Sequence, residues 1–342
     1  ISLGLGEYGI QPAQAVKIYK LYGDKSLEVV AENPYTLVED IYGISFNKAD
    51  EIASRIGIEA ESEFRIKSGI KYALSVFSNS GSTYVPKDIL LESAIKLLDI
   101  SSELIEENLT TLAFSGEIEL DSLDGVPVVY QHFYFQAEQS VTYHIKRIMN
   151  GYMPPLAADP DNLINAAEAE EKIQLSGDQR KAIRAALTNK ITIITGGPGT
   201  GKTTIINLIV KIFKLMGISV ALAAPTGRAA KRITETSGVE AMTIHRLLEY
   251  VYSEDENEME FGRNAENPLE EDSFIVDEAS MIDLMLMDGF LSALEDDSRL
   301  IIVGDADQLP SVGAGNVLLD MINSDYVPTI RLEEIFRQAS ES

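Results

Sequence analysis

A glycine-rich stretch near the middle of the chain has the residue types and the spacing of a phosphate-binding loop. Gly196, Gly201, Lys202 and Thr203 fit the pattern G-x-x-x-x-G-K-[ST]. Glycines let backbone N–H groups curl around anionic oxygens, a lysine ammonium can reach the β- and γ-phosphates, and a threonine hydroxyl can coordinate Mg²⁺. The expected ligands are therefore ATP and Mg²⁺, and the expected nucleotide contacts are Gly196, Gly197, Pro198, Gly199, Thr200, Gly201, Lys202, Thr203 and Thr204.

Two carboxylates follow a second apolar stretch, residues 273–276. Asp277 is expected to hold Mg²⁺ together with Thr203, directly or through water, and Glu278 to orient and deprotonate an attacking water as general base. A third apolar stretch, residues 299–303, leads to Gln308, whose amide could sense the γ-phosphate. With Lys202, these residues predict a site that hydrolyses a nucleoside triphosphate.

The elements that must position these groups can be recognised in the flanking residues. Residues 191–195 are apolar or β-branched, as in a buried strand, and residues 205–210 are mostly apolar, as in a buried helix. A strand that leads through a glycine-rich loop into a helix is the setting that the loop requires. We therefore expect an α/β P-loop NTPase domain with a parallel sheet over residues 175–342.

A weak internal repeat opens the chain. Gly9-Ile10 is followed by Ala15, and Gly43-Ile44 is followed by Ala49, and each pair precedes a helical pattern. This resembles a tandem helix-hairpin-helix over residues 1–61, a motif whose turn amides face a DNA phosphate. A small helical bundle with glycine turns is the alternative interpretation.

The next segment, residues 62–150, resembles a winged-helix module. Its pattern indicates a helix, a short strand, two helices and then two strands, at 117–120 and 126–135. Such modules bind DNA in some proteins and only pack against neighbours in others. We place the main domain boundary in a linker at residues 151–174, which holds Pro154, Pro155 and an Ala/Glu-rich piece that could be helical.

The composition excludes several classes of protein. The 342 residues include no Cys, which rules out disulfides and a thiol nucleophile, and no apolar run is long enough for a membrane span. No signal peptide is visible, so a cytoplasmic location is expected, and the first residue is not Met, so we expect a piece of a longer chain. The net charge of −26, concentrated in part over residues 254–272, should repel nucleic acid wherever basic groups are not gathered.

The order of the motifs resembles helicase superfamily 1 and, within it, the RecD-type DNA helicases. The resemblance is specific from about residue 175 to residue 338, and the hairpins ahead of it resemble the long bacterial RecD-like proteins that act without RecB and RecC. The motifs that carry it lie at residues 196–204, 224–230, 243–246, 276–280, 304–310 and 336–338.

The resemblance implies roles at matching positions. Gln179 would recognise adenine, while Ser176 or Asp178 could cap a helix there at the same time. Arg337 would stabilise the γ-phosphate in the transition state. A small hairpin insertion at about 249–266 would act as a strand-separating pin. Residues that would line a single-stranded DNA track are Pro225, Thr226, Arg228, Thr243 and His245, the last of which could instead be a core histidine.

The resemblance also implies the function. The expected protein is an ATP-dependent helicase that moves 5′→3′ along single-stranded DNA and unwinds duplex at junctions, in DNA repair or recombination. We expect it to act as a monomer that does not associate with a membrane. A single-strand binding protein or a nuclease could be its partner. Residues 175–342 would be the first of two RecA-like domains; because the second lies outside this chain, we expect weak nucleotide binding and slow hydrolysis by these residues alone.

Three alternatives stay open at this stage. The chain could be the motor part of a conjugative relaxase-helicase, or an RNA helicase of the same superfamily. It could also be a DNA-binding module that uses ATP only as a conformational ligand, although a binding module would need neither the base Glu278 nor Arg337.

Overall fold

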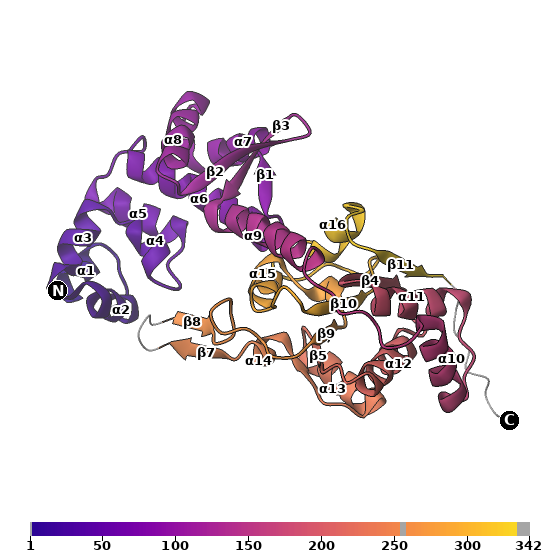
Figure 1. Ribbon diagram of the computed structural model, residues 1–342. Coiled ribbons are helices and arrows are strands. Elements are labelled where there is room, and N and C mark those ends of the chain that lie inside the picture. The colour runs from indigo at the N-terminus through magenta and orange to yellow at the C-terminus, as the bar shows by residue number, and fades with distance from the viewer. Residues whose placement is uncertain (1, 254–257, 334–342) are drawn as a thin grey trace. The chain divides into compact units, whose positions relative to one another are not determined.

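The chain divides into two compact units, residues 1–135 and 136–342. A computed structural model describes residues 2–253 and 258–333 (Figure 1). The division falls after Phe135, ahead of the segment at 151–174 in which the sequence places the main boundary. Among the described residues, no helix combines the length and the apolar character that crossing a membrane requires.

The first unit begins with a cluster of short helices. A glycine with positive φ joins α1 to α2 and another joins α4 to α5: Gly9 at 79° and Gly43 at 95°. The Gly9 turn is also crowded, since a Cβ there would lie 2.4 Å from Nη1 of Arg55. The expected pattern of helix, glycine turn and helix, occurring twice, is confirmed. The helices are α1 (Ser2–Glu7), α2 (Pro12–Tyr22), α3 (Ser26–Glu32), α4 (Thr36–Asp40) and α5 (Phe46–Ile56), with the 3-10 turn η1 (Gly23–Lys25) after α2.

The second part of this unit contains a three-stranded antiparallel sheet of order β1-β3-β2. The expected order of helix, strand, two helices and two strands is present: α6 (Glu63–Asn79), β1 (Tyr84–Pro86), α7 (Lys87–Leu98), α8 (Ser102–Phe114), β2 (Ile118–Leu123) and β3 (Val126–Gln131). The strand predicted to run to Phe135 ends at Gln131, and α9 (His132–Met149) begins directly after it. The aromatic run favours a strand locally, but buried Ala137, Val141 and Ile145 recur at helical spacing and extend the helix back to residue 132.

The second unit is built on a six-stranded parallel sheet of order β11-β4-β10-β9-β5-β6. Its central strands are buried along their length and apolar, as expected for a parallel sheet covered on both faces. This confirms the α/β fold. The strands are β4 (Ile191–Gly196), β5 (Val220–Ala224), β6 (Ala241–Thr243), β9 (Ser273–Val276), β10 (Arg299–Gly304) and β11 (Thr329–Leu332).

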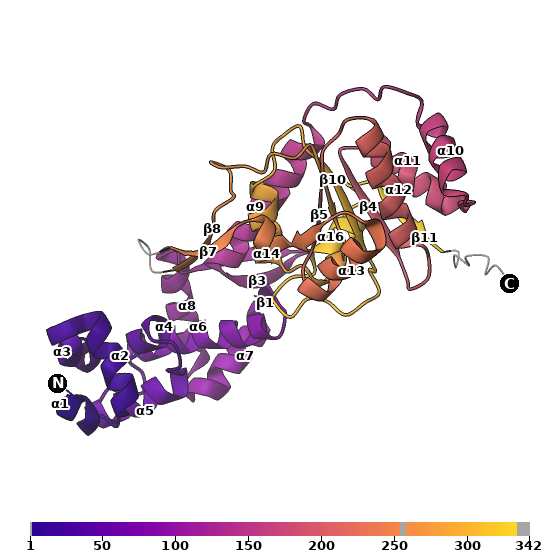
Figure 2. The ribbon, with the colours of Figure 1, turned by 90° about the horizontal axis from the view of Figure 1, so that it is seen from below.

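Helices and one hairpin complete this unit (Figure 2). The helices are α11 (Gly177–Thr188), α12 (Lys202–Leu215), α13 (Gly227–Ser237), α14 (Ile244–Leu247), α15 (Leu284–Ser292) and α16 (Val317–Asn323), with the 3-10 turn η2 (Ala279–Met281). The expected hairpin is present as β7 (Tyr250–Ser253) and β8 (Glu258–Phe261), which pair antiparallel. Its expected tip, residues 254–257, lies outside the described residues.

The expected linker is partly a packed helix. Helix α10 (Pro160–Glu171) lies beside α11 and α12 in both views (Figures 1 and 2), and its Ile164 and Ala167 are buried in the core of the second unit. Glu168 pairs with Arg180 of α11 at 2.6 Å. The interpretation of residues 151–174 as a linker is therefore wrong for α10, because an apolar stripe among its Ala and Glu residues packs onto the sheet domain.

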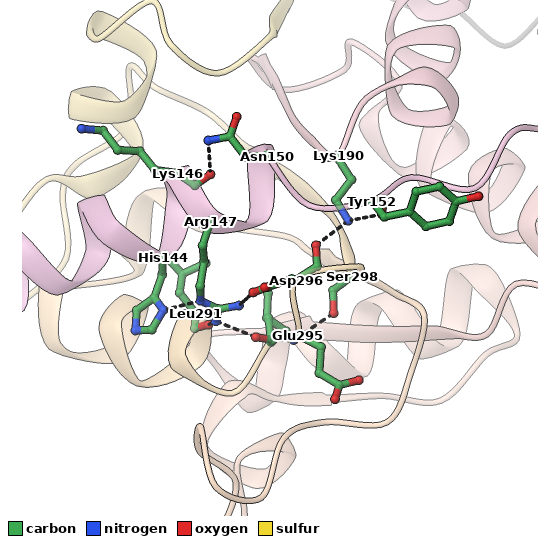
Figure 3. A network of polar contacts seen from close by, with 11 residues as sticks. His144, Lys146, Arg147, Asn150, Tyr152, Lys190, Leu291, Glu295, Asp296 and Ser298 are labelled. Carbon is green, nitrogen blue, oxygen red and sulfur yellow. Dashed lines mark hydrogen bonds and ion pairs between the residues drawn. The ribbon is translucent and has the colours of Figure 1, made fainter.

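Arg147 anchors the end of α9 to the last turn of α15 and the loop that follows it (Figure 3). Its Nη1 donates to a carboxylate oxygen of Asp296 at 2.8 Å, and its Nη2 donates to the carbonyls of Leu291 and Leu294. Its Nε donates to Nδ1 of His144 at 2.8 Å, and burial together with the charge of Arg147 lowers the pKa of that imidazole. His144 is therefore held neutral, with its ring nitrogen as an acceptor.

Lys190, just before β4, fastens the segment that follows α9 (Figure 3). Its Nζ donates to the carbonyls of Tyr152, at 3.2 Å, and Asp296, at 2.9 Å. The approach is close, since a Cβ on Gly151 would lie 1.7 Å from the Asp296 carbonyl oxygen. Burial lowers the pKa of Lys190 from 10.5 to about 8. Both hydrogen bonds survive deprotonation, because a neutral amine still carries two N–H donors.

The low pKa of Lys190 predicts a pH dependence of stability. Between pH 8 and 10.5 the unfolded chain keeps the proton that the folded chain has lost, so rising pH favours the folded state. The free energy of unfolding should gain at most about 3 kcal/mol from this residue over that interval. Urea denaturation of the wild type and of Lys190→Met at several pH values from 7 to 10 measures it. A difference between the two proteins that stays constant with pH would contradict the prediction.

Candidate functional site

The carboxyl ends of three adjacent parallel strands converge on one pocket. Strand β10 pairs with β4 on one side and with β9 on the other, so the segments that follow the three strands emerge side by side. The structure thus brings together the expected Lys202, Thr203, Asp277, Glu278 and Gln308. The pocket is lined by Pro198, Gly199, Gly201, Lys202, Thr203, Thr204, Arg232, Asp277, Glu278, Asp305 and Gln308.

The glycine-rich loop has a conformation that its glycines permit. Gly199 and Gly201 have φ values of 78° and 84°, in the left-handed region that favours glycine. The Nζ of Lys202 donates to the carbonyls of Gly196, at 2.5 Å, and Gly197, at 2.8 Å. A protonated ammonium has three donors, so one remains for a phosphate oxygen. The loop is therefore shaped as a cradle with its cation in place.

Three of the expected loop contacts lie behind the pocket surface rather than on it. Gly196, Gly197 and Thr200 are absent from the lining. The hydroxyl of Thr200 donates to the Gly197 carbonyl at 2.8 Å, and a Cβ on Gly196 would lie 2.7 Å from that hydroxyl. These residues fix the curvature of the loop, and their contact with nucleotide stays a prediction.

Asp277 is a partly buried carboxyl that directly follows β9. Its backbone N–H continues the sheet by donating to the Ala223 carbonyl, and its Oδ1 accepts from the backbone N–H of Glu278 at 2.8 Å. Burial raises the pKa of Asp277, and the charge of Glu278 adds to the rise; the hydrogen bond and the cations Lys202 and Arg232 act against it. Such a group gains from a cation brought into the pocket.

The donor set fits Mg²⁺ bound jointly with phosphates. Thr203 and Asp277 both line the pocket and offer oxygen ligands. Within the described ranges, no group of three or more His, Cys, Asp or Glu side chains forms a metal cage. Magnesium is commonly held by one or two carboxylates together with substrate phosphates and water, so a sparse protein set suits it.

Glu278 has a strained backbone. Its φ of 55° is in the left-handed region, which costs a residue other than glycine on the order of 1 kcal/mol or more. The next turn, η2, begins directly after it, and the residue lines the pocket. The surrounding strand and turn hold Glu278 in this conformation, which fits a residue whose position is set by function.

The turn after β10 ties Gln308 to the strand of the phosphate-binding loop. Thr195 accepts a hydrogen bond from the Ala306 N–H at 3.1 Å, and the Asp305 carbonyl accepts one from the Gln308 N–H at 3.2 Å. Asp305 is buried, lines the pocket and was not predicted as a site residue. Its signal in the sequence was the same as that of Asp277, an acid directly after a buried strand.

Arg232 is a second pocket residue that the sequence did not identify. It lies in α13, and its guanidinium is exposed to the pocket beside Asp277. No local pattern marks this arginine, because it reaches the pocket only through the packing of α13 against α12 and β5.

Gln179 is used by the protein in two ways. Its side chain and Ser176 form a reciprocal cap at the start of α11, in which its Oε1 accepts from the Ser176 N–H at 2.9 Å. Its Nε2 donates to the Thr200 carbonyl at 3.2 Å. Ser176, rather than Asp178, is therefore the cap. Gln179 is buried and does not line the pocket, so it supports the loop from behind, and recognition of adenine stays a prediction.

The residues predicted for a DNA track follow β5 and β6, on the far side of β9 from β4. Thr226 caps α13 and accepts from the Ala229 N–H at 3.3 Å, and Thr243 caps α14 and accepts from the Arg246 N–H at 3.1 Å. Pro225 is partly buried and Arg228 is exposed. They share the carboxyl edge of the sheet with the pocket without lining it.

His245 belongs to an aromatic cluster at the base of the hairpin. Its ring centroid lies 5.3 Å from that of Tyr250 and 6.1 Å from that of Phe261, and the latter two rings are 5.0 Å apart. A Cβ on Gly289 would lie 2.6 Å from Phe261, so glycine lets this ring approach α15. His245 is exposed rather than a core histidine. Arg337, the remaining expected site residue, lies outside the described residues.

The burial of Asp277 predicts opposite effects on stability and activity. The substitution Asp277→Asn removes a partly buried charge and keeps an oxygen that can accept from the Glu278 N–H. The melting temperature without Mg²⁺ at pH 7 should rise by about 2 °C or more, while Mg²⁺-dependent ATP hydrolysis should be lost. Calorimetry and a phosphate-release assay on the same preparations measure both. A lower melting temperature would show that the carboxylate charge stabilises the fold.

Comparison with known proteins identifies relatives of both units. Residues 1–84 match the family described as the ATP-dependent RecD2 DNA helicase HHH domain, and residues 179–314 match an AAA domain family. The chain is 29% identical to the ATP-dependent RecD2 DNA helicase of Deinococcus radiodurans, over 99% of this chain and 47% of that protein. It is 34% identical to the RecBCD enzyme subunit RecD of Mycolicibacterium smegmatis, over 57% of this chain and 37% of that protein.

The chain therefore spans about half the length, or less, of these curated relatives. Among solved structures, the Pif1 helicase from Candida albicans is similar over 49% of this chain and 42% of that chain, at 25% identity and a TM-score of 0.38.

Proposed function

We propose that the chain belongs to the RecD-type helicases and carries the ATP-hydrolysing site of a DNA helicase. One observation carries the proposal: the phosphate loop after β4, the carboxylates after β9 and Gln308 after β10 line a single pocket. A module that only binds nucleotide needs the loop, but it does not need a carboxylate held in a strained position beside it.

The pocket residues divide the work of hydrolysis. Lys202 would hold oxygens of the terminal phosphates, and Gln308 would contact the γ-phosphate. Glu278 would take a proton from a water molecule while the oxygen of that water forms a bond to the γ-phosphorus. The bond between the γ-phosphorus and the β–γ bridging oxygen breaks, and ADP and phosphate leave. Mg²⁺, bound by Thr203 and Asp277 together with the phosphates, would neutralise their charge.

The DNA side of the proposal rests on the strands next to the pocket. Pro225, Thr226, Arg228, Thr243 and His245 would line a track for single-stranded DNA at the ends of β5 and β6. Backbone amides and short hydroxyls there would hold phosphates without reading sequence. Movement in the 5′→3′ direction, adenine recognition by Gln179 and transition-state stabilisation by Arg337 belong to the same proposal.

The hairpin β7–β8 is proposed as the element that separates the strands at a single-strand/duplex junction. The aromatic cluster of His245, Tyr250 and Phe261 fixes its base, and an ion pair at 2.8 Å between Arg263 and Glu249 closes it. A rigid base is what a wedge needs to resist a duplex. The acidic residues around the hairpin would also repel the phosphates of the separated strands.

The proposal that this pocket hydrolyses ATP is tested with Lys202→Ala in the full-length protein that contains this chain. ATP hydrolysis by the wild type should rise on adding single-stranded DNA, and the variant should be slower by about 10²-fold or more, because a cation at the developing phosphate charge is lost. Lys214→Ala is the matched control, since Lys214 lies in the same helix outside the pocket. An active Lys202→Ala protein would contradict the proposal.

The hairpin is tested by replacing residues 252–259 with the two-residue turn Asn-Gly, which keeps the base of the hairpin and its aromatic cluster. Unwinding of a 5′-tailed duplex should be lost, whereas DNA-stimulated ATP hydrolysis should stay near the wild-type rate. A strand-displacement assay measures the first quantity and phosphate release the second. If the shortened protein unwinds duplex as well as the wild type, the hairpin is not the separating element.

A further inference from the structure

Arg232 brings a second cation into the phosphate pocket from an element that carries none of the expected nucleotide residues. Its helix, α13, follows β5, two strands away from the β10 end that carries Gln308. The guanidinium lines the same pocket as Lys202, Thr203 and the two carboxylates after β9. It therefore approaches the pocket from the side opposite to the phosphate loop.

Among the described residues, Arg232 has Asp277 as a charged neighbour but no hydrogen-bond or ion-pair partner that would fix its guanidinium. Some other arginines of this unit are engaged in ion pairs: Arg180 pairs with Glu168, and Arg184 pairs with Asp161. In the part of the chain that the structure describes, no ion pair or hydrogen bond uses the guanidinium of Arg232. Its donors are thus available to a ligand in the pocket.

The charges in the pocket show why a second cation matters. Lys202 and Arg232 are the cations of the lining, against the three acids Asp277, Glu278 and Asp305. A polyphosphate entering this lining meets more negative than positive side chains, so each cation has a large share in its binding. An arginine is suited to the role, because its planar fork can donate two parallel hydrogen bonds to phosphate oxygens.

The strand order indicates which phosphate Arg232 would meet. The loop after β4 and the start of α12 hold the phosphates nearer the nucleoside, and the chain of phosphates then runs toward β10 and β9, where Gln308 and Glu278 lie. Arg232 lies beyond Asp277 in this direction. We infer that Arg232 contacts the γ-phosphate of bound nucleoside triphosphate and makes the site discriminate triphosphate from diphosphate.

This contact would give α13 a direct response to the state of the nucleotide. Arg232 lies in the same helix as Arg228, one turn further along, and the helix is capped by Thr226. Both of these residues belong to the proposed DNA track. A γ-phosphate held by Arg232 would favour one position of α13, and its loss on hydrolysis would release that preference. The inference rests on the proposed function, because it needs a nucleotide in this pocket.

The test uses the full-length protein that contains this chain, as the wild type and as each variant. For each of these proteins it compares the dissociation constant of the triphosphate analogue ATPγS with that of ADP, both in the presence of Mg²⁺. In Arg232→Gln the constant for ATPγS should rise about tenfold, from the loss of a charge-assisted bidentate contact, while that for ADP should change by less than about twofold. Arg232→Lys keeps the positive charge without the planar guanidinium, so its dissociation constant for ATPγS should lie between those of the wild type and Arg232→Gln. The matched control is Lys231→Gln, the same loss of charge at an exposed neighbour outside the pocket.

The outcomes separate the inference from the function on which it rests. Unchanged constants in Arg232→Gln, or an equal rise for both nucleotides, would overturn the γ-phosphate contact while the ATP site itself stands. A wild-type protein that binds neither nucleotide would overturn the proposed function as well. Melting curves of the variants, expected to match the wild type because Arg232 is exposed and unpaired, exclude loss of the fold as the cause.

Discussion

The parallel pairing of β4, β10 and β9 is the constraint on which the site depends. Their register places Gly304 opposite Thr195 and Ile302 opposite Val276, so the three strands end almost level. Loops that leave level strand ends must meet, and here they bring a phosphate cradle, a strained Glu278 and Gln308 to one pocket. A shift of one residue in either pairing would separate Lys202 from the carboxylates.

At the opposite edge of the same sheet, three cations donate to backbone carbonyls. They are Arg147, which is partly buried, and the buried Lys190 and Arg299, whose acceptors include the Leu187 carbonyl at 2.9 Å. Such contacts satisfy carbonyls that would otherwise be buried without partners. The two edges are thus complementary: one is fastened by internal hydrogen bonds, and the other keeps polar groups available for a ligand.

The pocket itself is less stable than a purely structural arrangement of the same strands would be. Burial disfavours the charge of Asp277, and the backbone of Glu278 is held in the left-handed region. Both costs fall on the two residues for which we propose the most demanding chemical tasks, Asp277 as the metal ligand and Glu278 as the general base. A polyphosphate with its cation would relieve the first cost, so the fold and the ligand are expected to stabilise each other.

The sequence by itself determined the local features. Residues 196–204 form the glycine-rich connection from β4 into α12, acids follow the buried strand at 273–276, and glycines join helices at residues 9 and 43, because spacing and residue type act within a few neighbours. Tertiary structure decided what depends on distant segments. It ended β3 at Gln131, packed α10 into the core and brought Arg232 into the pocket. The physical reason is that sheet order and helix packing join residues far apart in the chain, and no local pattern encodes them.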